Sequence, residues 1–346
     1  MEQPYDVTIG MPVYNVEKYI RGAMDSALGQ SFPNIEFLVV DDCGTDASID
    51  IVQEYQLSHP RGAAIRVVRQ PHNMGVGMAR NRIIDEAKGK YLFFFDPDDE
   101  LMPKAIETLH EQALRYDADI IYGSHERVEL FGDMKKVTAF LYPSRQFLGE
   151  DDFPGYAYQR YENIQAQTWN FLIKTEIYRR NKIRYKQLNF WEDFTTTIDL
   201  PTYIGRAVLL PDITYRYYCR SGSLSNYQQR KHIDKQEILK TIEAMAQVKQ
   251  NSERLRSKSY FPKRLYKVML THFYIACAIL RQKGVIDPRF SNREIRDLML
   301  SPLSFRETLC LHEWRFKNMS LSLLGILPPW LSVVMMKLIG KERRLV

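Results

Sequence analysis

A run of five apolar or aromatic residues, Tyr91-Leu92-Phe93-Phe94-Phe95, leads directly into the acidic sequence Asp96-Pro97-Asp98-Asp99. An uninterrupted apolar run of this length is typical of a strand that is buried on both faces of a sheet. The carboxylates that follow repel one another unless a cation or hydrogen-bond donors compensate them, and Mg²⁺ and Mn²⁺ prefer such oxygen ligands. The junction therefore predicts a metal-diphosphate site. The alternative is a solvated acidic turn before a helix that begins near Pro103.

The first 120 residues alternate four times between a strand-like and a helix-like segment. The expected pairs of strand and helix are 7–11 with 17–28, 35–40 with 47–57, 65–68 with 76–87, and 91–95 with 103–116. Such alternation predicts an α/β fold with a mainly parallel sheet, right-handed crossovers and helices on both faces. Ligands of open sheets lie beyond the carboxyl ends of the strands. We therefore expect Asn15, Asp41-Asp42 and 96–98 at one rim.

Beyond residue 120 the pattern changes to shorter strand-like segments and then to helices. The expected strands are 120–122, 126–131, 136–141, 169–173, 207–210 and 213–219, and the clearest helices are 233–250 and 265–282, with another beginning near Glu192. We expect a catalytic domain over 1–226 and a helical C-terminal region over 227–346. Within the catalytic domain, 1–120 would form a nucleotide-binding half and 121–226 an acceptor-side half.

Composition limits the classes of protein that fit. The chain has 346 residues, of which 45% are hydrophobic, and a formal net charge of +6. It can bury a large core, and its charge permits an anionic partner. No interleaving of basic and aromatic residues supports nucleic-acid binding. The four cysteines lie far apart without the spacing of a zinc site, which favours a reducing, cytoplasmic location.

Three loops after the expected strands carry groups suited to a nucleotide. The sequence Pro12-Val13-Tyr14-Asn15 can present backbone N–H groups and a tyrosine ring to a base, although Tyr14 could equally be a packed aromatic residue. The segment 41–46 offers paired carboxylates to a base or ribose, and Thr45 or Asp46 could cap the next helix. Asn73-Met74-Gly75-Val76-Gly77 lets the backbone approach a phosphate at a helix N-terminus.

Two later segments supply further polar groups. Glu192-Asp193 stands between aromatic residues, an environment that could desolvate a carboxylate and make it a base, or simply an acidic helix N-terminus. The segment 215–225, Tyr-Arg-Tyr-Tyr-Cys-Arg-Ser-Gly-Ser-Leu-Ser, combines two arginines with hydroxyls and could clamp a diphosphate. Arg80-Asn81-Arg82 adds donors on a helix, where Arg82 could as well be a solvated residue.

In this order, the motifs resemble those of the family 2 glycosyltransferases of the GT-A fold. The matching residues are Pro12 to Asn15, Val40-Asp41-Asp42 with Thr45-Asp46, Asn73-x-Gly75 with Ala79-Arg80-Asn81, Asp96-x-Asp98-Asp99, 191–194 and 215–225. Each motif is weak alone, but their order and spacing together are specific. The resemblance covers about residues 5–226.

This resemblance implies roles for individual residues. Asp193 would be the general base of an inverting transfer, Asp98 would bind a divalent metal (Mn²⁺ or Mg²⁺), and the nucleotide would be bound by Pro12, Tyr14, Asn15, Asp42, Asn73, Gly75 and Asp96. Of these, Tyr14 would stack on the base, Asp42 would accept hydrogen bonds from it, and Asp96 would hold the ribose. Secondary candidates are Glu17, Arg80, Asp99, Glu192 and Arg220. The donor would be a nucleotide sugar, UDP-linked as is usual for the family, and the acceptor a saccharide or lipid-linked saccharide of a bacterial surface polysaccharide or glycolipid pathway.

The chain departs from the family pattern at two places. The family usually has Gly-Ser where this chain has Cys43-Gly44, which bears on the geometry of the nucleobase loop. The Gln-x-x-Arg-Trp motif of processive synthases is missing, so we expect transfer of single sugars. Two other classes remain as alternatives: a nucleotidyltransferase, which also uses strand-end carboxylates, and a sugar-nucleotide binding module without transferase activity.

The segment 319–340 consists of two apolar stretches on either side of Pro328-Pro329, with Lys341-Glu342-Arg343-Arg344 after it. Each stretch is too short to span a bilayer. Apolar stretches with a tryptophan and a basic flank suit peripheral contact with anionic lipid at the inner face of the cytoplasmic membrane. The alternatives are a helical hairpin that covers the core, or a dimer interface.

Overall fold

The computed structural model describes residues 4–131, 134–159, 167–188, 191–220 and 231–345. The chain forms two compact units. The first consists of Met1–Phe153, Ala166–Gln187 and Glu192–Ser223, and the second of Pro154–Gln165, Leu188–Trp191 and Leu224–Val346. The division expected at residue 226 stays a prediction.

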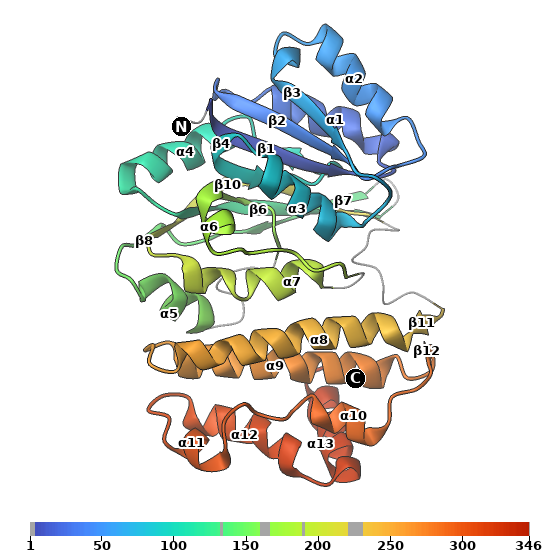
Figure 1. Cartoon of the computed structure of the whole chain (residues 1–346), viewed down its shortest axis with the longest axis vertical. Helices are drawn as coiled ribbons and strands as arrows, with labels where there is room; N and C mark the ends of the chain where they lie inside the picture. Colours follow the sequence, from blue (N-terminus) through green and yellow to red (C-terminus); the bar gives the residue numbers. More distant parts are fainter. Residues whose placement is uncertain (1–3, 132–133, 160–166, 189–190, 221–230, 346) are drawn as a thin grey trace. The chain divides into compact units, whose positions relative to one another are not determined.

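A mixed sheet forms the centre of the first unit (Figure 1). Its strands are β1 (Tyr5–Val13), β2 (Ile35–Asp41), β3 (Ile65–Arg69), β4 (Gly89–Phe94), β5 (Glu100–Leu101), β6 (Ile120–Phe131), β7 (Met134–Phe140), β8 (Arg145–Phe147), β9 (Phe171–Lys174) and β10 (Ala207–Cys219). The order is β3-β2-β1-β4-β9-β6-β10-β5, with β7 beside β6 and β8 beside β10. The first four strands in this order are mutually parallel, and β9 runs antiparallel to both of its neighbours.

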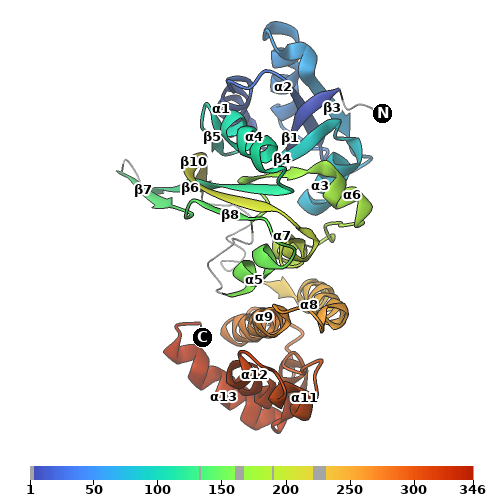
Figure 2. The same ribbon diagram turned by 90° about the vertical axis from the view of Figure 1, so that its left-hand side faces the viewer.

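Helices cover both faces of the parallel strands. They are α1 (Glu17–Leu28), α2 (Ser48–Ser58), α3 (Val76–Glu86), α4 (Ala105–Tyr116) and α6 (Thr175–Arg180). The unit also contains α7 (Glu192–Thr197) and the short 3₁₀ helices η1 (Gly62–Ala64) and η2 (Leu200–Tyr203), and α5 (Asp152–Gln159) lies at the boundary between the two units in the sequence. Figure 2 shows α1 and α4 on one side of β1 and β4, and α3 and α6 on the other. Phe93 belongs to the core under α1 and α4. Its neighbour Phe94 packs against Tyr178 of α6. The strand β4 is therefore buried on both faces, as its apolar run predicts.

The four expected pairs of strand and helix are confirmed, whereas two expected strand breaks are wrong. Segments 120–122 and 126–131 form the single strand β6, because Gly123 leaves room for Thr214 of the adjacent β10: a Cβ at Gly123 would lie 2.0 Å from the Thr214 hydroxyl. Segments 207–210 and 213–219 likewise form one strand. There the register shifts between Leu209 and Ile213, and this irregularity accommodates Pro211.

The second unit is mainly helical. Its elements are β11 (Ile233–Asp234), α8 (Lys235–Asn251), η4 (Ser252–Leu255), α9 (Phe261–Arg281), β12 (Ile286–Asp287), α10 (Asn292–Asp297), α11 (Phe305–Leu309), α12 (Arg315–Ile326) and α13 (Pro329–Glu342). The helix α8 begins at Lys235 rather than at residue 233, because Asp234 accepts a hydrogen bond from Gln236 N–H as an N-cap and its strand pairs with β12. Among the described helices, none has the length and apolar character needed to cross a bilayer.

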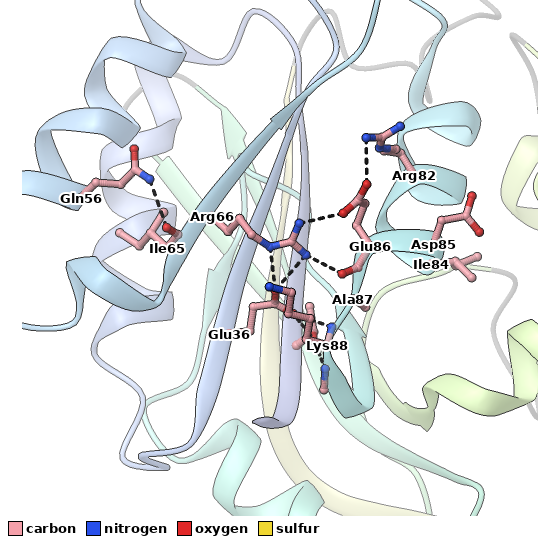
Figure 3. Close-up of polar contacts among 12 residues, drawn as sticks. Glu36, Gln56, Ile65, Arg66, Arg82, Ile84, Asp85, Glu86, Ala87 and Lys88 are labelled. Atoms are coloured by element: carbon pink, nitrogen blue, oxygen red, sulfur yellow. Dashed lines mark hydrogen bonds and ion pairs between the residues drawn. The ribbon is translucent and has the colours of Figure 1, made fainter. Parts of the chain in front are cut away.

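A buried carboxylate fastens the amino-terminal ends of the parallel strands. Glu36 of β2 accepts hydrogen bonds from the Thr8 hydroxyl (2.6 Å), Lys88 N–H (2.7 Å) and Arg66 Nε (3.0 Å). Arg66 also donates to the Glu86 carboxylate at 2.8 Å and to the Glu86 carbonyl (Figure 3). The contacts of Thr8, Lys88 and Arg66 with the Glu36 side chain thus compensate its charge.

Substituting Arg66 tests the value of this pairing. The change Arg66→Met leaves the Glu36 side chain, which is 2% exposed, without its cation. The free energy of unfolding in urea should fall by about 3 kcal/mol, the usual cost of stranding a buried ionic partner. Arg115→Met, at an exposed position of α4, is the matched control. Equal effects of the two substitutions would contradict the assignment.

Candidate active site

The carboxyl ends of β1, β2 and β4 meet at one rim, as the sequence predicts. Val13 pairs with Asp41, and Gly10 pairs with Phe94. The loops that follow these ends carry most of the predicted site residues. Pro12 lies within β1 and is buried opposite Val40, whereas the Tyr14 side chain is 47% exposed at the rim.

The loops that follow β1 and β2 are joined by hydrogen bonds from side chains. The Asn15 side-chain oxygen accepts a hydrogen bond from Thr45 N–H at 2.7 Å. Asp46 accepts from Glu17 N–H (2.8 Å), and Glu17 in turn accepts from Ala47 N–H (3.2 Å). Asn15 and Glu17 therefore shape the loops around Tyr14, and Asp46 satisfies the first N–H of α1 as well as that of Ser48 in α2.

Cys43 occupies the position where the family usually has glycine. Its φ of 60° is left-handed, a conformation that costs a non-glycine residue about 1–2 kcal/mol. The Cys43 thiol contacts the Gln70 carbonyl at 3.1 Å, and the backbone N–H donates to Asp41 at 2.9 Å. The loop 41–46 thus keeps a backbone shape suited to glycine while carrying a cysteine.

Asp42 organises the third loop. Its two carboxylate oxygens accept hydrogen bonds from Met74 N–H and Gly75 N–H, each at 2.9 Å. Burial raises the pKa of Asp42, and the two backbone donors oppose that shift. Gly75 has a φ of 86° and begins α3, while Asn73 is exposed. In this structure Asp42 therefore holds the glycine-containing loop, and its contact with a nucleobase stays a prediction.

One guanidinium gathers three carboxylates at the rim. Arg80 of α3 lies 3.2 Å from Asp96 and 3.4 Å from Glu192, and it hydrogen-bonds Asp193. The Arg80 side chain is 3% exposed. Burial raises the pKa of Asp96 to about 6 and that of Glu192 to about 7, although the guanidinium opposes both shifts. The structure thus brings the predicted ribose ligand and the predicted base to one cation.

Asp98 and Asp99 differ in accessibility. Asp98 lies 3.5 Å from the Arg220 guanidinium, and its side chain is 30% exposed. Burial raises the pKa of Asp98, and Arg220 opposes this shift. Asp99 is buried and accepts hydrogen bonds from Tyr215 O–H and Tyr218 N–H, both at 2.8 Å. Asp99 therefore joins the acidic loop to β10, and Asp98 is the carboxylate that a ligand can reach.

The acidic loop fits a divalent metal that takes most of its ligands from elsewhere. In the described part of the chain, no group of three or more His, Cys, Asp or Glu side chains is arranged to hold a metal ion. Mg²⁺ and similar ions commonly use one or two protein carboxylates together with substrate phosphates and water. Asp98, whose side chain is 30% exposed, can supply one such carboxylate.

Several contacts at the site were not anticipated from the sequence. Asn81 exchanges two hydrogen bonds with the Tyr185 backbone, at 2.8 and 2.9 Å, which fixes α3 next to the Tyr185 ring. The Arg220 guanidinium carbon lies 3.8 Å from the centroid of the Tyr19 ring. For the Asn81 contacts the available signal was the position of Asn81 directly after Arg80, and the Arg220–Tyr19 contact had no local signal. The predicted serines and glycine of 221–225 lie outside the described residues.

Comparison with known proteins agrees with the geometry. The family model described as glycosyl transferase family 2 matches residues 8–208. Glycosyltransferase GlyG of Streptococcus pneumoniae is 29% identical over 229 residues, which cover 63% of this chain and 72% of GlyG. Succinoglycan biosynthesis protein ExoO of Rhizobium meliloti is 29% identical over 235 residues, 66% of this chain and 65% of ExoO. The match to S. pneumoniae glycosyltransferase GlyA covers only 31% of that longer protein.

Solved structures share the fold. A crystal structure of S. aureus TarS in complex with UDP-GlcNAc aligns with a TM-score of 0.65 at 19% identity, over 92% of this chain and 90% of that one. Mannosyltransferase PcManGT from Pyrobaculum calidifontis, in complex with GDP-Man and Mn²⁺, aligns with a TM-score of 0.52 at 15% identity, over 96% and 87%. The expected GT-A fold is confirmed, and a nucleotidyltransferase or a binding module is disfavoured.

A family match over more than half of the chain, on a sheet whose rim gathers Arg80, Asp96, Asp98 and Asp193, shows that the chain belongs to glycosyl transferase family 2 and is a glycosyltransferase of the GT-A fold.

Proposed function

We propose that this enzyme transfers one sugar at a time, with inversion, from a UDP-linked donor to a hydroxyl of a saccharide or lipid-linked saccharide. The reaction would serve bacterial surface polysaccharide or glycolipid synthesis. The observation that carries this proposal is the Arg80 cluster, in which the predicted ribose ligand Asp96 and the predicted base Asp193 share one cation. The TarS complex with UDP-GlcNAc and the name of ExoO support the donor class and the pathway class.

Two charged groups would serve the departing diphosphate. Asp98 would hold Mn²⁺ or Mg²⁺, which would supply positive charge to the leaving group when bound. Arg220 stands beside Asp98 and can offer a planar, permanently charged guanidinium to phosphate oxygens. Such electrostatic stabilisation removes the need for a general acid to protonate the leaving group.

Asp193 would accept the proton of the acceptor hydroxyl. It lies in the first turn of α7, and its backbone is tied into that helix by the Thr197 hydroxyl, which donates to the Asp193 carbonyl at 3.0 Å. The contact with Arg80 restricts the orientation of the carboxylate. A base that is held in this way can meet an acceptor hydroxyl without a further search of conformations.

Nucleotide titration tests the donor class directly. Calorimetric titration of the full chain with UDP, GDP, CDP and dTDP, each with and without Mn²⁺, should show binding of UDP that Mn²⁺ strengthens. Metal-dependent binding of another nucleotide would correct the base while keeping the transferase. Absence of binding by all four would contradict the proposed nucleotide-sugar donor.

Two substitutions separate metal binding from proton transfer. Asp98→Ala should abolish the strengthening of UDP binding by Mn²⁺, because the accessible carboxylate is lost. Asp193→Asn should leave that binding intact and lower the transfer rate by about 10²–10⁴-fold, the usual contribution of a general base. Asp50→Asn, on the exposed face of α2, is the matched control and should change neither quantity. Loss of nucleotide binding in both site variants would refute the separate roles.

The proposal includes peripheral contact with a membrane through 319–340. Seven large apolar side chains of α12 and α13 are exposed: Phe316 (76%), Leu323 (49%), Ile326 (60%), Trp330 (62%), Val334 (45%), Met335 (37%) and Leu338 (59%). Ile326 and Trp330 flank the turn at Pro328-Pro329. Residues 315–346 contain six Lys or Arg residues and one Glu, a net charge of +5. Exposed apolar side chains in a segment of this charge suit contact with an anionic lipid surface at the cytoplasmic membrane.

Vesicle flotation tests this contact. The full chain should float with phosphatidylglycerol-containing vesicles but not with pure phosphatidylcholine vesicles, and salt should weaken the binding. The double substitution Trp330→Ser and Leu338→Ser should reduce binding about tenfold or more, because each side chain buries considerable apolar area in the lipid. Leu57→Ser, at a site that is 92% exposed on α2, is the matched control. A chain that forms a dimer by light scattering and ignores both kinds of vesicle would instead make this face a dimer interface.

A further inference from the structure

Arg80 is a buried cation held in one place by its surroundings. It lies in the second turn of α3, five residues after the left-handed Gly75 that begins the helix. The next residue, Asn81, is fixed to the Tyr185 backbone by two hydrogen bonds. The Tyr185 ring lies 5.7 Å from the Arg80 guanidinium carbon. The backbone and the side chain of Arg80 are therefore both constrained before any substrate binds.

The partners of Arg80 come from opposite sides of the site. Nη2 faces Asp96, which follows β4 and belongs to the nucleotide-binding side. Nη1 faces Glu192 and Asp193, which begin α7 on the acceptor side. The planar guanidinium can serve both sides at once because its donors have fixed directions, a property that a lysine ammonium lacks.

The cluster has more negative than positive charge. Three carboxylates face one guanidinium when all are ionised. Glu192 contacts only Nη1, at 3.4 Å, and has Asp193 as its sequence neighbour. Burial and the charge of Asp193 raise the pKa of Glu192 to about 7, and the charges of Asp96 and Arg80 act in opposite directions on it. The charge of Arg80 therefore favours the ionised form of Glu192.

We propose that Arg80 is the positioning residue of the transfer step: it holds Asp193 in the orientation that a base requires, and it ties that orientation to Asp96. The inference rests on the proposed function, because it assigns Arg80 to the same site. Arg80 does not touch the reacting atoms in this scheme. A displacement of the base by about 1 Å is enough to cost about 10²-fold in rate.

Two substitutions of Arg80 separate its charge from its geometry. Arg80→Lys keeps the charge but loses the planar guanidinium with its fixed donor directions. The transfer rate should therefore fall about 10²-fold, while the acidic limb of the pH–rate profile stays in place. Arg80→Met removes the charge that lowers the pKa of Glu192, so this pKa should rise and the acidic limb should move to higher pH. Raising the pH should then recover part of the rate. The readouts are kcat, KM and the pH–rate profile with the most active UDP-sugar and acceptor found for the unmodified enzyme.

Arg82 provides the matched control on the same helix. Its side chain is 43% exposed and pairs with Glu86. Arg82→Lys and Arg82→Met should leave kcat and the pH–rate profile unchanged. Calorimetric titration with UDP shows whether each Arg80 variant keeps a folded nucleotide site, and if Arg80→Met does not fold, Arg80→Lys alone decides through kcat.

Two results would overturn the inference. One is a wild-type kcat in Arg80→Lys. The other is a loss of rate in the Arg80 variants that only parallels a loss of UDP binding, with no movement of the acidic limb in Arg80→Met; a merely structural role would produce this result. Failure of the unmodified enzyme to bind UDP or to transfer sugar would instead refute the proposed function.

Discussion

Parallel pairing of β4 with β1 determines where charge can appear in the first unit. Both faces of β4 are covered, since Phe93 packs in the core and Phe94 packs against Tyr178. An ionised group between Tyr91 and Phe94 would be cut off from water, so the first carboxylate comes at Asp96, where the strand has ended. The register of β1 with β2 brings the Asp42 loop to the same rim. The location of the site thus follows from the burial of one strand.

Buried carboxylates are compensated to different degrees at the two ends of the parallel strands. At the amino-terminal end, Glu36 receives donors from Thr8, Lys88 and Arg66, so its charge is fully compensated. At the carboxyl end, three carboxylates share Arg80, so the cluster has more negative than positive charge. A compensated network stiffens a fold, whereas an uncompensated one responds to protons, metals and substrates. One sheet therefore combines a rigid end with a responsive one.

The parts that could be predicted from the sequence are those set by local pattern. The alternation of strands and helices to residue 116 and the gathering of loops at one rim both follow from hydrophobic periodicity. The continuity of β10 through Pro211 could not be predicted from the sequence, because a bulge depends on the neighbouring strand. Two sets of tertiary contacts also have no local signature in the sequence. Asp42 accepts a hydrogen bond from Gly75 N–H, and Arg80 contacts Glu192 and Asp193, which lie 112 and 113 positions further along the chain.

The sequence distance between Arg80 and Asp193 also bears on how the enzyme is made. A growing chain completes β1 to β4 and α3 well before α7 leaves the ribosome. Until then Arg80 has only Asp96 as an ionic partner from this cluster. The arrival of α7 then brings Glu192 and Asp193 to the guanidinium. A nascent chain that has not yet added α7 therefore holds this cation with one of its three carboxylates.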